Sequence, residues 1–177
     1  MTARAHPFEA IPMKKLFTVA LAVVAFSSTG CAGMRAAQAR SKFIQTAVMA
    51  HTYQRPCNDI WGAARTMLFA RDFQVKSADA AAGLTLETEW KITTNGSSMA
   101  SSRYLFQGNA PAAGQCQVSA TMAHKNQQGS TSMNRDWQME WDLLKQVDIE
   151  AAQRIEADAT AAGEVMRETT IGKQINA

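Results

Sequence analysis

The fold of this chain is decided by residues 84–92, which read LTLETEWKI. Every second residue is apolar or small and those between are polar or charged, the period of two that is typical of a β-strand. Such a strand has one dry and one wet face, as in an antiparallel sheet covered on one side. The residues expected on the dry face are Leu84, Leu86, Thr88, Trp90 and Ile92.

Shorter runs with the same period lie on either side of this strand. Residues 73–77 (FQVKS) precede it, and residues 103–107 (RYLFQ) follow it. Residues 115–125 give a further strand, in which Cys116 points to the core. The segments between these runs are rich in Gly, Asn, Ser or Pro, as loops are. The centre of the chain therefore predicts three or four antiparallel strands.

Two helices complete the expected fold. Residues 60–71 and 137–162 carry apolar residues at the helical period, and an Asn or Asp that can cap the first turn precedes each. A first strand is expected over residues 44–52, although a helix over residues 36–50 competes because Ala, Gln, Arg and Met favour helices. The predicted class is α+β, with four to five antiparallel strands and both helices on one face, in the order β-α-β-β-β-β-α.

The N-terminal region carries a targeting signal. Residues 14–31 read KKLFTVALAVVAFSSTGC: two lysines, a short apolar stretch, small residues and a cysteine. The apolar stretch is too short for a membrane span and fits a secretory signal. It resembles a bacterial lipoprotein signal, although Ser28 stands where that family usually has Leu. The resemblance implies cleavage before Cys31 and acylation of its thiol; an ordinary secretory signal, which leaves Cys31 unmodified, is the alternative.

The signal sets the expected organisation of the chain. Residues 1–30 form the signal peptide, and the first twelve of them are interpreted as an upstream extension because Met13 precedes the two lysines. Residues 31–43 are small and polar and are expected to be a tether. A single domain is expected over residues 44–168, and residues 169–177 show no pattern and are expected to fray.

Cys57 and Cys116 form an even pair once Cys31 is assigned to lipid. An exported chain meets an oxidising compartment, which favours a disulfide between them. Such a bridge would close a loop of roughly 60 residues and stabilise the fold by about 4 kcal/mol. The alternative is a pair of buried thiols that act as small hydrophobic side chains.

Residues that could carry catalysis or a metal do not fall into a chemical pattern. His51 and His124 lack the spacing of a zinc site, and the serines lack a nucleophile elbow. Glu87 and Glu89 share the wet face of the central strand, where solvated carboxylates are common. We therefore expect a non-enzymatic protein without cofactor or metal.

Charge and aromatic residues indicate the kind of partner. Residues 31–177 carry 15 Lys and Arg against 14 Asp and Glu, without a basic block, which argues against nucleic acid. Trp137 and Trp141 lie one turn apart on the second helix. They belong either to the core or to an exposed aromatic strip that anchors a partner protein.

A longer pattern is similar to the domain of the BamC-like outer-membrane lipoproteins, which have a helix-grip topology. The residues that carry the likeness are Tyr53-Gln-Arg-Pro56, Ile60-Trp61, Leu68, Phe73-x-Val75, Asp79, Gly83-Leu84 and Thr88-x-Trp90. Asp72 replaces the glycine that this family usually has before Phe73. The pattern concerns packing and supplies no catalytic residue.

The resemblance implies a protein of the outer membrane that is anchored by lipid and faces the periplasm. Ala32 after the acylated cysteine implies delivery to the outer membrane in the same family. Its expected role is a protein-binding accessory module, in outer-membrane protein assembly. The alternative is a carrier that holds a lipid or other apolar ligand between the sheet and the long helix.

Overall fold

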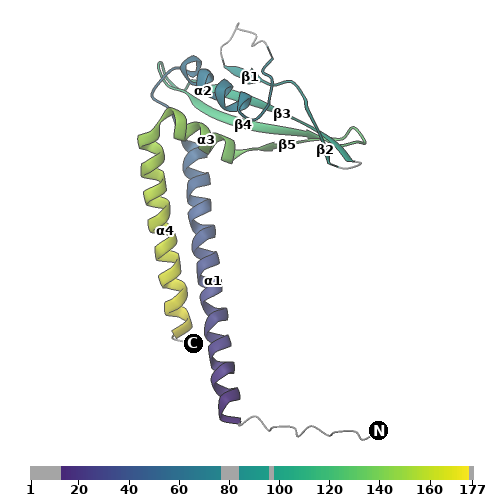
Figure 1. Ribbon diagram of the computed structural model, residues 1–177. Helices are drawn as coiled ribbons and strands as arrows, with labels where there is room; N and C mark the ends of the chain where they lie inside the picture. Colours follow the sequence, from purple (N-terminus) through teal and green to yellow (C-terminus); the bar gives the residue numbers. More distant parts are fainter. Residues whose placement is uncertain (1–12, 77–83, 96–97, 176–177) are drawn as a thin grey trace, which may run out of the picture.

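The computed structural model describes the backbone of residues 13–76, 84–95 and 98–175, and the side chains of residues 32–76, 84–94 and 99–172 (Figure 1). Within these stretches the chain forms four helices and one five-stranded sheet. The elements are α1 (Met13–Ala50), α2 (Cys57–Phe69), β1 (Thr85–Glu87), β2 (Lys91–Asn95), β3 (Ser98–Asn109), β4 (Gln117–Lys125), β5 (Thr131–Arg135), α3 (Trp137–Val147) and α4 (Ile149–Ile175).

The sheet is antiparallel throughout and is organised around the long strand β3. β2 pairs with the first half of β3, and β1 pairs with its second half. β4 pairs with residues 101–109 of β3, and β5 pairs with the second half of β4. The predicted α+β class with an antiparallel sheet is confirmed.

The core lies between the sheet and the helices α2 and α3. Leu86, Phe106 and Ala120 are register partners on three adjacent strands and are fully buried. Burial of each large apolar side chain contributes roughly 1.5–3 kcal/mol. The fully buried helix residues of the same cluster are Ile60, Ala64, Leu68, Leu143 and Leu144.

The helices α1 and α4 form an antiparallel pair that projects from this core, and we call the pair the stalk (Figure 1). The two backbones approach closely because small residues meet: a Cβ atom on Gly163 would lie 3.1 Å from the carbonyl oxygen of Ala36. Arg40 Nη2 donates to Glu156 Oε1 across the pair at 2.8 Å. These contacts make residues 32–43, the expected tether, part of a packed helix.

Several predicted elements are wrong, and the stalk accounts for most of them. Residues 44–50 are helical rather than a strand, because Ile44 and Val48 lie one helical turn apart and face the core together. The competing helix interpretation was the right one. Residues 169–175, the expected frayed tail, are helical too. The expected domain boundaries therefore fall inside α1 and α4, and the first element is a helix.

The C-terminal half differs from the prediction in two further ways. The long helix is interrupted at Asp148, whose Oδ1 accepts from the backbone N–H of Ala151 and so caps a new helix. Residues 126–134 are rich in Gln, Gly and Ser and were expected to form a loop, but residues 131–134 belong to β5 (Thr131–Arg135). Residues 73–76 make only the isolated bridge between Val75 and Thr88, and residue 77 lies outside the described residues.

A polar joint fixes the stalk to the sheet. Arg135 Nε and Nη2 donate to the two carboxylate oxygens of Glu140 at 2.7 and 2.9 Å. Arg135 Nη2 also donates to the carbonyl oxygen of Met49 at the C-terminal end of α1, and Glu140 Oε1 accepts from the backbone N–H of Ala120. The hydrogen bond with Glu140 raises the pKa of Arg135. One ion pair thus joins α1, β4, β5 and α3.

Candidate interaction surface

The segment between β1 and β2 has one residue more than the stretch of β3 that lies opposite it. The register pair Glu87–Leu105 of β1 is followed by the pair Lys91–Ser102 of β2. Three residues of one segment therefore stand opposite two residues of β3, which is the geometry of a β-bulge. A shift of one residue turns all following side chains to the other face of the sheet.

The bulge moves two residues that were expected in the core. Leu86 and Thr88 are buried on the helix-covered face, as the alternation predicts. Trp90 and Ile92 lie on the opposite face, and Ile92 is 61% exposed. The prediction that these two residues share the dry face is wrong, because the alternation along the chain does not reveal the extra residue.

Trp90 forms the base of a charged cluster on this open face. The guanidinium of Arg103 stacks over the indole ring, with Cζ 4.8 Å from the ring centroid. Arg103 Nη1 donates to Glu87 Oε1, and Lys76 Nζ lies 3.5 Å from the same oxygen. These contacts hold the arginine over the tryptophan ring, an arrangement of the cation–π type.

Exposed apolar side chains continue the open face outward. Ile92, Met99 and Met133 are 61%, 54% and 56% exposed. The register places them on one face, because Ser101 pairs with Ile92, and Ala123 pairs with both Arg103 and Met133. In Figure 1 this end of the sheet extends away from α2 and α3. The open-face patch consists of Trp90, Ile92, Met99, Arg103 and Met133.

The composition of the open-face patch suits protein binding. Tryptophan and arginine are the residues most enriched at the energetic centres of interfaces. Methionine adapts its flexible side chain to irregular surfaces. A grouped set of exposed apolar side chains on a sheet is typical of an interaction site.

Across residues 13–76, 84–95 and 98–175, no group of three His, Cys, Asp or Glu residues is placed to hold a metal ion.

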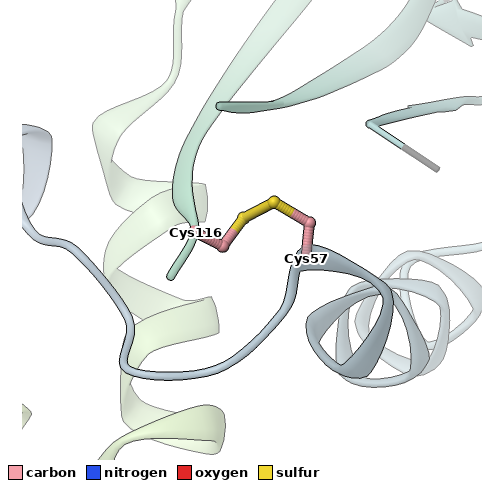
Figure 2. Close-up of a disulfide and its surroundings, with 2 residues drawn as sticks. All are labelled: Cys57 and Cys116. Atoms are coloured by element: carbon pink, nitrogen blue, oxygen red, sulfur yellow. A yellow bond between two sulfur atoms is a disulfide. The ribbon is translucent and has the colours of Figure 1, made fainter. Parts of the chain in front are cut away.

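The disulfide between Cys57 and Cys116 is present (Figure 2). Cys57 begins α2, and Cys116 lies just before β4, where it also bridges to Tyr53. The bond therefore ties the start of α2 to the start of β4 in the sheet. A Cβ atom on Gly108 would lie 2.7 Å from Cys57 Sγ, so the bridge packs directly on the backbone of β3.

The other predicted site residues do not join the open-face patch. Trp137 and Trp141 are half-buried on α3, and Trp141 packs against the core with Lys145 Nζ 5.7 Å from its ring. A role of the two tryptophans in partner binding stays a prediction. Cys31 lies in α1, and its side chain is outside the described residues. None of the described helices is long and apolar enough to span a membrane.

A scan against models of known protein families finds no match for this chain, and a search of curated proteins finds none either. The likeness to BamC-like lipoproteins therefore stays a prediction.

The two histidines considered for a metal site lie apart. His124 is exposed near the end of β4, whereas His51 is half-buried where α1 meets the α3–α4 junction. The ring of His51 stands edge-on to Tyr53 at 4.6 Å. Its Nε2 lies 3.6 Å from Asp148 Oδ2, too long for a hydrogen bond. Burial lowers the pKa of His51, while the Asp148 carboxylate partly opposes that shift.

This environment makes stability depend on pH. Because the folded state favours neutral His51, the unfolded state binds more protons between the lowered pKa and the ordinary value of 6.5. The free energy of unfolding should therefore fall as the pH drops through this window. His51→Gln should remove that part of the decrease when urea unfolding is compared at pH 7.5 and 5.5. His124→Gln serves as the control, because it also removes one histidine. An equal pH dependence of the free energy of unfolding in the two variants would contradict the assignment of this effect to His51.

Proposed function

We propose that this protein is a lipid-anchored accessory protein of the outer membrane that faces the periplasm and binds another envelope protein. The observation that carries the proposal is the open-face patch, where Trp90 and Arg103 are grouped with three exposed apolar side chains. The partner class, a component of outer-membrane protein assembly, follows from the likeness of the sequence to BamC-like lipoproteins.

The stalk supports this arrangement. The signal in residues 14–31 supplies export and an acylated Cys31 at the mature N-terminus. From residue 31 to residue 50, α1 rises by about 29 Å at 1.5 Å per residue. An anchor at Cys31 would therefore hold the sheet about that far from the bilayer, where a partner protein can reach the open-face patch.

The proposal assigns no catalytic residue, cofactor or metal. The alternative role, a carrier of an apolar ligand, requires a cavity between the sheet and the helices. That interior is occupied by the side chains of Ile60, Leu68 and Phe106, all fully buried. The packing thus favours protein binding over ligand transport.

Photocrosslinking in living cells tests the proposal. A photoreactive amino acid at Met133 should give a defined protein adduct, whereas the same group at Phe69, which is similarly exposed on α2, should not. Ile92→Ser and Met99→Ser together should reduce the Met133 adduct at least tenfold, because both exposed side chains contribute contact area rather than core packing.

Circular dichroism and thermal unfolding show whether the double variant keeps its fold. Identical adducts at Met133 and Phe69 would mean that the crosslinks report diffusion rather than docking. An adduct at Met133 that persists in the folded double variant would place the partner elsewhere. Either result would refute the open-face patch as the binding surface.

A further inference from the structure

The register of the stalk relates the end of α4 to the proposed anchor. Gly163 lies against Ala36 in the antiparallel pair. Five residues further along each helix, residue 168 stands opposite Cys31. Because α4 continues to Ile175, its last seven residues reach about 10 Å past the level of Cys31.

Cleavage of the signal changes what surrounds these last turns. Figure 1 shows α1 running on beyond the C-terminal end of α4. Thr170, near this end of α4, is 5% exposed. Cleavage before Cys31 removes residues 13–30 and with them the helix beside residues 169–175. The side of α4 that faced α1 is then uncovered at the level where the acyl chains are attached.

The side chains at this end of the stalk suit a membrane surface. Met34, Val165, Met166 and Ile171 are four of the large apolar residues that the fold leaves exposed. Arg35 and Arg167 are exposed among them and can reach phosphate groups with their flexible side chains. Exposed apolar side chains at the level of an acyl anchor can enter the headgroup region, and the neighbouring arginines add attraction to anionic lipids.

We infer that the C-terminal turns of α4 lie in the headgroup region of the bilayer beside the acylated Cys31. The inference rests on the proposed lipid anchor and adds a second, non-covalent membrane contact. The occupant is the phospholipid surface, because the anchor places these turns at or below its own level. Two points of contact fix the direction of the stalk, whereas acyl chains alone leave it free to pivot.

A fluorescent label at Gly172 tests the contact. A Cβ atom at Gly172 or at Gly62 of α2 would have no neighbour within 4 Å outside the adjoining helix backbone, so Gly172→Cys and Gly62→Cys form a matched pair. The introduced thiol is the reactive one when Cys57 and Cys116 are bonded and Cys31 is acylated. Each full-length variant is processed in cells, labelled with an environment-sensitive dye and reconstituted into phosphatidylethanolamine–phosphatidylglycerol vesicles.

The label at residue 172 should shift its emission to shorter wavelength and be quenched at least fivefold more by a bilayer-resident quencher than the label at residue 62. A label on Val165→Cys, exposed in the same region, supplies a second position if Gly172→Cys does not fold. Equal weak quenching at both ends of the protein would overturn the inference.

Flotation and mass spectrometry of the same samples distinguish a failure of the membrane contact from a failure of the lipid anchor. Protein that floats with the vesicles and carries acyl chains, but leaves the residue 172 label in water, overturns the membrane contact alone. Protein that carries no acyl mass and does not float overturns the lipid anchor, and the contact with it.

Discussion

The variant Cys57→Ala/Cys116→Ala should unfold with a free energy about 4 kcal/mol lower than that of the oxidised protein. The bond links residues 59 positions apart, so it removes the entropy of a long loop from the unfolded chain. The loop contains α2 and the strands β1 to β3. Most of the sheet and one covering helix therefore lose their covalent constraint together.

Urea unfolding of three samples measures this effect. Comparison of the oxidised protein with the reduced protein and with the alanine variant distinguishes the effect of losing the bond from the effect of losing the sulfur atoms. Both cysteine side chains are buried, so the alanine variant should be slightly less stable than the reduced protein. The variant itself should not respond to reductant. Agreement of the oxidised and reduced midpoints would contradict a stabilising role of the bond.

Local patterns in the sequence predict the parts of the fold that are determined locally. The apolar period of α2 and the alternation in β4 need no information from other segments, and both elements form where expected, α2 beginning three residues early. Asp136 caps α3 by accepting from the backbone N–H of Met139, in agreement with the Asn or Asp cap expected before this helix. The disulfide was predicted from the compartment and the count of cysteines, and it is present.

The candidate site depends on register, which is a relation between segments. Residues 84–92 alternate without interruption, yet the bulge before Lys91 turns Trp90 and Ile92 to the open face. Only the pairing with β3 reveals that shift. The pairing of α1 with α4 is also a relation between segments, because the contact of Gly163 with Ala36 joins residues more than 100 positions apart. The small residues at this contact form no apolar stripe from which the sequence could predict it.

The second large effect is expected at the polar joint. Glu140→Ala should lower the free energy of unfolding by about 3 kcal/mol, because Glu140 is 2% exposed and its removal leaves Arg135 without its carboxylate partner. The backbone N–H of Ala120 also loses its acceptor, and a buried donor without a partner adds to the cost. The Arg135 side chain is about a third exposed, so water offsets part of the loss.

Two further variants show whether the geometry of the joint carries this effect. Glu140→Gln keeps an oxygen that can accept from Ala120 but loses the charge, and should cost less than half as much as Glu140→Ala. Glu156→Ala breaks the exposed pair with Arg40 and should change the stability by no more than about 0.5 kcal/mol. Equal decreases in the free energy of unfolding for Glu140→Ala and Glu156→Ala would mean that the Glu140 carboxylate is as well solvated as a carboxylate on the stalk. The attachment of the stalk to the sheet would then rest on apolar packing around Val48 and Ala152 rather than on the ion pair.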